Sequence, residues 1–389
     1  MAYTIAPENL KAATRSLLTY CRECGWAGWD PYDGLNSRLF QAVPFFQNKL
    51  CRLVLIQFMK RSPVNLRRLA GVPRRQNPKG VALFASALVQ LSRVGLGRIE
   101  EARGLADSLA DRGCPGQKHA CWGYHFDWQT RTVLVPSTVP NIICTTFVAN
   151  AFLDLYDATG HGPYLELAQS AGRFVTDELA AGLPDDRFCI RYYVLDDSTV
   201  HNASLLGAAL LARLVGYRRE AGLENCARKA ARYSIERQRP DGSWPYGEEP
   251  TQSWVDSFHT GYNLLALRSI GRQLEVPGLP EAVRRGYDYY RRHFFREDGA
   301  VRYFHNRTYP VDAHAVGHAL LTLAEFSDGD PSALEQAGRC FSWAMANLRS
   351  PEGYFYYQRW QWFTNRISYI RWAQAWMLAG LTALVRRAV

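Results

Sequence analysis

A helical repeat with a period of just under sixty residues constrains this chain more than any single motif. Pairs of apolar residues recur at intervals of 54 to 64 residues, each inside an Ala/Leu-rich segment of helical length. The pairs are Leu88-Val89, Phe152-Leu153, Leu210-Leu211, Leu264-Leu265 and Leu320-Leu321. A looser sixth copy covers residues 369–387. Repeats of this length indicate a stacked or closed helical array, and six helix pairs are the number that an (α/α)6 toroid needs.

The apolar segments predict the inner ring of such a toroid, because they are apolar on almost every face, as helices buried on most sides are. They begin near Lys79, Asn141, His201, Asp256, Asp312 and Tyr369. The intervening segments carry charge on one face and predict an outer ring; they are 164–179, 224–237, 280–294 and 331–348. We therefore predict an all-α fold, a single (α/α)6 toroid domain over residues 1–389, in which residues 1–78 form a helical segment that joins the rings.

Composition and charge narrow the class of protein. At 389 residues, with 47% hydrophobic and 21% charged residues, the chain has an ordinary globular composition. No signal peptide is recognisable, and the longest apolar runs are far shorter than a membrane span. We therefore expect a cytoplasmic protein with no transmembrane segment. The net charge of +10 comes largely from arginines on the outer helices and in 67–75. Solvated surface explains most of it, and attraction to an acidic polymer or a membrane surface is the lesser alternative.

Cofactor and nucleic-acid signatures are weak or absent from the sequence. Nine cysteines are scattered along the chain, and Cys21 and Cys24 form one CxxC that no second CxxC or HxxxH follows. This pattern predicts reduced thiols and no metal site, since structural zinc needs four ligands. There is no P-loop, no Gly-rich turn after a strand and no RNA- or DNA-binding motif. We expect no cofactor and no nucleic-acid partner.

The links that lead from outer to inner helices are long and aromatic, and several alternate like short β-hairpins. In a two-ring toroid all these links emerge at one end, so they predict a funnel lined by rings and polar groups. Its candidate binding residues are Trp122, Tyr124, Asn141, Asn202, Trp244, Trp254, Tyr303, Trp360, Arg366, Arg371 and Trp372. Such surfaces suit sugars, whose C–H faces stack on rings. The structural alternative is that the aromatic residues cap the inner helices as a secondary core.

Acids and histidines recur at equivalent points of the repeat. Asn202, Asp256 and Asp312 fall at the first turns of three inner helices, where Asp and Asn are also common N-caps. His201, His259 and His314 lie beside them, and capping does not require a histidine. The links add Asp127, Asp197 and Glu248. The eight catalytic candidates are Asp127, Asp197, Glu248, Asp256, Asp312, His201, His259 and His314.

Two reaction types fit this set. A pair of carboxylates from different links could act as general acid and base at a glycosidic bond, with roughly 5–10 Å between them. Alternatively, a Tyr or His could abstract a proton next to a uronate carboxylate that Arg366 or Arg371 neutralises, as a lyase or epimerase would. A cavity without a carboxylate pair, but with such a base beside an Arg, favours the second type.

One segment points to a different class of toroid. Residues 238–244, QRPDGSW, are similar to the QW repeat of terpenoid cyclases. The acid motif of that family, DxDD, is absent, and 194–197, VLDD, lacks the first Asp. The Cys-His-Gly set of zinc-dependent toroids is also absent. Terpenoid cyclisation is therefore the least favoured alternative.

Several segments together resemble bacterial exopolysaccharide-biosynthesis proteins of the six-hairpin glycosidase-like superfamily, such as the Vibrio polysaccharide protein J. They are 30–36 (DPYDGLN), 122–129 (WGYHFDWQ), 140–141, 147–151, 201–203 and 371–376 (RWAQAW). The last is also similar to the α/α domain of D-glucuronyl C5-epimerases, whose N-terminal β-rich parts this chain lacks.

The resemblance implies a role in making or trimming a surface polysaccharide. It implies a glycan or a lipid-linked oligosaccharide as the partner, together with the polysaccharide synthesis machinery. Our leading expectation is a polysaccharide-binding and polysaccharide-modifying protein, with hydrolysis ahead of lyase or epimerase chemistry. A non-catalytic glycan-binding component is the alternative from a different class.

Overall fold

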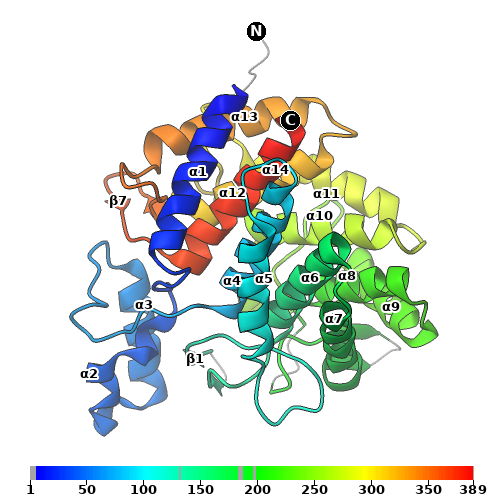
Figure 1. The fold of residues 1–389 in the computed structure, drawn as a ribbon, viewed down its shortest axis with the longest axis horizontal. Helices are drawn as coiled ribbons and strands as arrows, with labels where there is room; N and C mark the ends of the chain where they lie inside the picture. The colour runs from blue at the N-terminus through cyan, green and yellow to red at the C-terminus, as the bar shows by residue number, and fades with distance from the viewer. Residues whose placement is uncertain (1–5, 131–132, 183–186, 196–198, 389) are drawn as a thin grey trace.

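The computed structural model describes residues 6–130, 133–182, 187–195 and 199–388, and Figure 1 shows their helices arranged around a common centre. Six helices form an inner ring. They are α4 (Pro78–Ser92), α6 (Ile142–Thr159), α8 (His201–Tyr217), α10 (Ser257–Gly271), α12 (Ala313–Phe326) and α14 (Ala375–Ala388). Each contacts the next, and α14 contacts α4, so the ring closes. The predicted (α/α)6 toroid is confirmed.

An outer helix packs on each inner helix. Five outer helices follow their inner partners along the chain: α5 (Ile99–Ala110), α7 (Gly162–Phe174), α9 (Ala221–Glu236), α11 (Leu279–Phe294) and α13 (Ser332–Asn347). The sixth position belongs to α1 (Pro7–Glu23), which packs on α14 and buries Leu10, Leu17 and Leu18. The two ends of the chain therefore share one hairpin.

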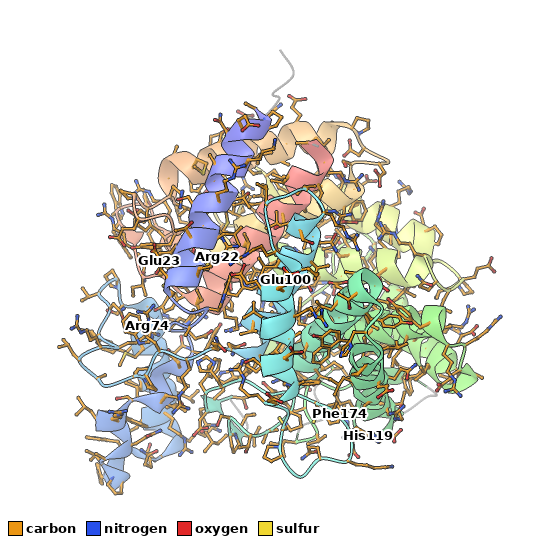
Figure 2. The ribbon with its side chains drawn as sticks, in the orientation of Figure 1. Arg22, Glu23, Arg74, Glu100, His119 and Phe174 are labelled. Atoms are coloured by element: carbon orange, nitrogen blue, oxygen red, sulfur yellow. The ribbon has the colours of Figure 1, made fainter. Side chains whose placement is uncertain are left out.

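A charged contact fixes α1 against the first repeat. Arg22 at the end of α1 donates from Nε and Nη2 to the Glu101 carboxylate of α5, at 2.8 and 2.7 Å. Figure 2 shows Arg22 beside Glu100, the neighbour of that glutamate in the sequence. Since α1 belongs to the last hairpin and α5 to the first, this pair joins two adjacent outer helices.

The inner helices begin close to the predicted positions, because polar N-cap residues define their first turns. Asn77, Asn141, Asp256 and Asp312 are N-caps whose side chains accept hydrogen bonds from backbone N–H groups of the first turn. The last repeat differs. Tyr369 precedes a π-helical segment, η5 (Ile370–Gln374), and α14 starts only after it. The π-helical turn changes the direction in which the side chains of 370–374 leave the helix.

Short antiparallel strands lie in the links. Strand β1 (Trp128–Gln129) pairs with β2 (Leu134–Val135), and β3 (Ala180–Gly182) pairs with β4 (Phe188–Ile190). Strand β6 (Gln358–Arg359) pairs with both β5 (Val311–Asp312) and β7 (Thr364–Asn365). The registers place Trp128 opposite Val135 and Asp312 opposite Gln358. These pairings fix the predicted β-hairpin links.

One segment stands outside the two rings. It contains the 3-10 turn η1 (Asp33–Asn36), α2 (Arg38–Gln41), the turn η2 (Pro44–Phe46) and α3 (Lys49–Arg61). Figure 1 shows α2 and α3 at the lower left, beyond the toroid. We refer to residues 38–75 as the arm. Its helices contact mainly η1 and β1. Within the part of the chain that the structure describes, no helix is long and apolar enough to cross a bilayer.

Candidate functional site

A cavity of about 1290 Å³ opens where the links meet the first turns of the inner helices. Every inner-helix position contributes to its lining: Lys79 from α4, Ile143 from α6, Asn202 from α8, His259 from α10, His314 from α12 and Arg371 from η5. The walls are largely aromatic and include Tyr32, Tyr124, Phe126, Trp128, Tyr192, Tyr193, Tyr246, Trp254, Phe258, Tyr262, Tyr303, Phe304 and Trp372. The predicted funnel at one end of the toroid is therefore present.

His259 and Asp256 form a hydrogen-bonded dyad in this cavity. His259 Nδ1 lies 2.6 Å from Asp256 Oδ2, and the His259 backbone N–H donates to Oδ1 at 2.9 Å. Trp254 Nε1 donates to the same Oδ2 at 3.1 Å. The carboxylate therefore places the imidazole hydrogen on Nδ1, and Nε2 carries the lone pair. Nε2 makes no hydrogen bond to any residue that the structure describes, and the side chain is 21% exposed. This arrangement suits a general base.

A second polar chain runs through the cavity floor. Lys79 Nζ donates to the Tyr262 hydroxyl at 3.0 Å, and this hydroxyl lies 3.1 Å from His314 Nε2. Because the hydroxyl accepts from Lys79, its own hydrogen is free to point to His314. Burial lowers the pKa of His314 well below its usual value, and the nearby Lys79 lowers it further. His314 is therefore neutral, with its hydrogen on Nδ1.

Lys79 is itself held in an apolar setting. Its ammonium group lies 4.7 Å from the ring centre of Phe147 and 5.1 Å from that of Trp376. Burial lowers the pKa of Lys79 well below its usual value, and the Arg371 charge adds to this effect. Lys79 therefore loses its proton more readily than an exposed lysine does.

Arg371 is anchored by Asp30. Its Nε and Nη2 donate to the two Asp30 carboxylate oxygens at 2.5 and 2.8 Å, and both side chains are buried. Burial alone would raise the pKa of Asp30, but the Arg371 charge and hydrogen bonds hold it below its usual value. The guanidinium also lies 5.2 Å from the centre of the Tyr124 ring. The predicted anion-binding Arg371 thus lines the cavity with two of its nitrogens already paired.

The predicted acids separate in the structure. Asp256 lines the cavity, whereas Asp312 is buried beneath it. Gln358 Nε2 and Trp372 Nε1 both donate to the Asp312 carboxylate, at 2.7 and 3.0 Å. Burial raises the pKa of Asp312 to about 6, against the opposing hydrogen bond from Gln358. Asp312 is therefore a cap that also orients Trp372.

The remaining acids lie elsewhere. Glu248 Oε1 lies 3.0 Å from His201 Nε2, outside the cavity lining, and His201 Nδ1 lies 3.3 Å from Ser234 Oγ. Asp127 accepts from the Ser137 backbone N–H at 2.9 Å and is also outside the lining. Asp197 lies outside the described residues. The lining does include Glu249, an exposed neighbour of Glu248.

The predicted aromatic set divides in the same way. Tyr124, Trp254, Tyr303 and Trp372 line the cavity. Trp122 and Trp244 are instead fully buried at the ends of hairpins, and their indole N–H groups donate to the carbonyls of Leu109 and Ser234. Trp360 stacks on Phe363 in the β6–β7 hairpin. These three indoles therefore support the hairpins rather than the cavity, as the alternative of a secondary core describes.

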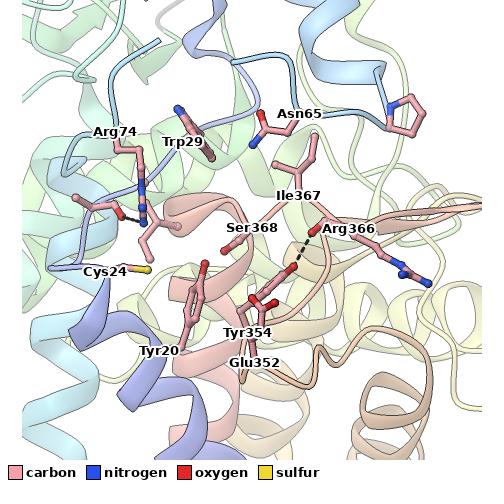
Figure 3. Close-up of a pocket in the computed structure, with 14 residues that line it drawn as sticks. Tyr20, Cys24, Trp29, Asn65, Arg74, Glu352, Tyr354, Arg366, Ile367 and Ser368 are labelled. Atoms are coloured by element: carbon pink, nitrogen blue, oxygen red, sulfur yellow. Dashed lines mark hydrogen bonds between the residues drawn. The ribbon is translucent and has the colours of Figure 1, made fainter. Parts of the chain in front are cut away.

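The polar binding candidates also divide. Asn202 lines the cavity, while Asn141 caps α6 by accepting from the Cys144 N–H at 2.8 Å. Arg366 lies at a separate groove of about 360 Å³ that also contains Tyr20, Trp29 and Tyr354. Figure 3 shows this groove and the hydrogen bond from the Tyr354 hydroxyl to the Arg366 carbonyl. Arg366 is therefore not part of the cavity.

Several residues that build the site were not among the predicted site residues. Lys79 and Tyr262 line the cavity and hold His314 in place, and the buried Asp30 behind the lining holds Arg371. For Asp30 the sequence offered one indication of a role in the site: it belongs to segment 30–36, which carried the family resemblance. For Lys79 the indication was weaker, because it is a single lysine at the start of an otherwise apolar inner helix.

Solved structures of other proteins share this fold. No family model and no curated protein matches the chain. Among solved structures, an unsaturated glucuronyl hydrolase specific for heparin is similar with a TM-score of 0.65 and 12% identity, over 98% of both chains. A GH76 α-mannanase of Bacteroides thetaiotaomicron has a TM-score of 0.63 and 13% identity, over 82% of this chain and 89% of its own. A cellobiose 2-epimerase from Spirochaeta thermophila has a TM-score of 0.56 and 13% identity, over 81% and 89%.

The fold is an (α/α)6 toroid similar to those of these three enzymes. At these identities the similarity shows the architecture and leaves the chemistry to this chain's own residues.

Proposed function

We propose that this protein is a carbohydrate-modifying enzyme that moves a proton at a carbon next to a carbonyl group, as an epimerase or isomerase does. The observation that carries the proposal is the His259–Asp256 dyad, which leaves the lone pair of His259 Nε2 open in an aromatic cavity. Aromatic walls suit the C–H faces of a sugar. The named activity of the cellobiose 2-epimerase, which has a similar fold, supports the same class of reaction.

The reaction assigns a role to each group. His259 Nε2 takes the proton from carbon, and the electron pair of the broken C–H bond forms an enediolate with the neighbouring carbonyl. Asp256 holds the imidazole and stabilises the imidazolium that forms. Arg371 lies on the same cavity and supplies positive charge for the enediolate oxygen, and Lys79, also on the cavity, can donate an N–H to it. Return of the proton from His259 Nε2 to the neighbouring carbon gives the isomer. Its return to the other face of the original carbon, after the enediolate has turned in the cavity, gives the epimer.

Hydrolysis is the second candidate, and one observation favours it. Glu249 and Asp256 both line the cavity, so the described residues do place two carboxylates there. The glucuronyl hydrolase and the α-mannanase, by their names, cleave glycosidic bonds in the same fold. Against this, both Asp256 oxygens are engaged by His259, and Trp254 adds a further hydrogen bond. A free carboxylic acid would be the better proton donor to a leaving oxygen.

For the biological setting, we propose that the enzyme acts in the cytoplasm on a glycan, or on a lipid-linked precursor, during exopolysaccharide production. The family resemblance of segments 30–36 and 122–129 supports this role. Flanking genes for glycosyltransferases and a polysaccharide exporter would be expected. Flanking genes for isoprenoid synthases would contradict it.

Product analysis tests the chemistry. The purified protein is incubated with a panel of reducing mono- and disaccharides and with unsaturated uronate oligosaccharides. We expect an epimer or a ketose of unchanged mass, and we expect the His259→Asn variant to form it at least about a hundredfold more slowly. New reducing ends with a loss of chain length would instead assign hydrolysis. A folded protein that binds these sugars and converts none of them would make it a glycan-binding component.

A further inference from the structure

The arm carries almost all of the net charge of the protein, which corrects the expectation that arginines on the outer helices supply much of it. Residues 38–75 contain nine Lys and Arg residues and no Asp or Glu, so they account for nine of the ten net positive charges of the chain. Arg67 is neutralised by Asp33, whose carboxylate lies 2.6 Å from its Nε. The other eight basic residues include the exposed Arg38, Lys49, Arg61 and Arg68. The arm therefore presents a strongly cationic surface.

The same arm exposes large apolar side chains. All ten residues from 41 to 50 are exposed, and along α3 the exposed residues Leu50, Val54 and Phe58 follow one another at four-residue spacing. The exposed fractions are 83% for Phe45, 70% for Leu50, 59% for Val54 and 55% for Phe58. Residues at this spacing lie on the same face of a helix, so the three side chains form one apolar stripe. In water such a face is unfavourable, so its occurrence indicates a binding surface.

We propose that the arm docks this protein on a membrane surface that contains anionic lipid. Phe45 and the α3 stripe would enter the boundary between headgroups and acyl chains, while the lysines and arginines pair with lipid phosphates. An apolar face flanked by basic residues is the pattern of helices that lie in the membrane interface. Charge complementarity with an anionic leaflet supplies the long-range attraction.

Two other occupants fit the arm less well. A second copy of the chain would bring the eight basic residues other than Arg67 against the same eight, with no acid within residues 38–75 to offset them. An acidic polysaccharide would use the charge and could stack on Phe45 and Phe58, but it offers no partner for the exposed aliphatic Leu50 and Val54. The lipid surface is the partner that uses both properties.

The arm also borders the cavity. A groove of about 530 Å³ on α3 is lined by Leu53, Val54, Gln57, Phe58, Arg61 and Ser62. Three of these, Leu53, Gln57 and Arg61, also line the site cavity. Docking through α3 would therefore place the mouth of the cavity beside the headgroups, where the sugar of a lipid-linked glycan lies.

Vesicle co-sedimentation tests the docking without any sugar, so its result is independent of the proposed chemistry. The full-length protein is mixed with vesicles of phosphatidylcholine alone, or with 30–40% phosphatidylglycerol (chosen as a strongly anionic mixture). We expect binding to the anionic vesicles and its loss at about 0.5 M salt. The Phe45→Ser/Phe58→Ser variant should bind at least about tenfold more weakly. The Lys49→Gln/Arg68→Gln variant should lose roughly fivefold per charge.

Matched control variants lie on the outer ring. Leu334→Ser removes a partly exposed apolar side chain from α13, and Arg218→Gln removes an exposed charge next to α8; both should bind as the wild type does. Thermal melting confirms that the arm variants are folded. Wild-type protein that ignores anionic vesicles would overturn the proposal. So would a dimer that Phe45→Ser dissociates while vesicle binding persists, or vesicle binding that the control variants weaken as much as the arm variants do.

Discussion

The ion pair between Asp30 and Arg371 gives a sharp prediction, because it joins the N-terminal segment to the last repeat across the cavity wall. Asp30→Asn keeps the side-chain shape but removes the negative charge. The arginine would stay charged, because a guanidinium is not deprotonated in proteins. It would then lie without its counter-ion at a site where its side chain is 4% exposed, among the rings of Tyr124, Phe126 and Trp372. An unpaired charge at such a site is costly.

The magnitude follows from burial and chain length. Breaking one side of a buried ion pair costs about 3–5 kcal/mol. For 389 residues, an unfolding entropy of about 2.1 cal/mol/K per residue gives roughly 0.8 kcal/mol/K. The expected fall in Tm is therefore about 4–6 °C. Because the pKa of Asp30 is lowered in the fold, the contribution is present above about pH 4 and is lost as the pH falls below it.

Differential scanning calorimetry at pH 7 and pH 3.5 measures this effect. The matched control is Glu281→Gln, which breaks the exposed pair with Arg284 and should change stability by less than about 1 kcal/mol. Adding Arg371→Met to Asp30→Asn should recover part of the lost stability, since no buried charge then remains. A Tm equal to that of the wild type for Asp30→Asn, or a further full loss in the double variant, would refute the reasoning.

Three further predictions follow from the site. Asp256→Asn should lower turnover at least about tenfold with a Tm shift within a few degrees, since it removes the acceptor that orients His259; equal turnover in steady-state assays would remove the dyad from the account. As the pH rises from 4 to 7, the Asp312→Asn variant should gain up to about 2–3 kcal/mol in free energy of unfolding relative to the wild type. The reason is that only the wild type must ionise a buried carboxyl, whose pKa is about 6. Urea denaturation measures this difference, and a constant difference across the range would contradict the burial argument. Substrate sugars at millimolar concentration should quench tryptophan fluorescence, and Trp254→Phe, but not Trp244→Phe, should reduce that change; the reverse order would place the sugar elsewhere.

Most of the fold could be predicted from the sequence, because the difference in burial between inner and outer helices gives them different patterns of apolar residues. Inner helices are apolar all round and outer helices are not, so the starts of five inner helices fall within one residue of their predicted positions. The role of α1 as the sixth outer helix was not readable. Pairing of α1 with α14 joins residues from opposite ends of the chain, and no local pattern encodes such a contact.

The site was only partly readable, for a physical reason. Composition identified the links that converge, and it placed Asp256, His259, His314, Arg371 and Trp372 among the candidates. It did not distinguish side chains that face the cavity from those that face the hairpin cores, so Trp122 and Trp244 were grouped with Trp254. Whether an indole turns inward depends on where its N–H finds an acceptor, and for Trp122 and Trp244 that acceptor is a carbonyl of an outer helix.

The central claim is that His259 acts as a base at carbon, and solvent isotope exchange tests it most directly. The protein is incubated in D2O with each reducing sugar that it binds, and the C–H signal next to the carbonyl is followed by NMR. We expect wild-type protein and the His293→Gln control, on outer helix α11, to exchange this hydrogen for deuterium at similar rates. His259→Asn should exchange it at least about a hundredfold more slowly. Exchange by His259→Asn at the wild-type rate, or bond cleavage by the wild type without any exchange, would contradict the account.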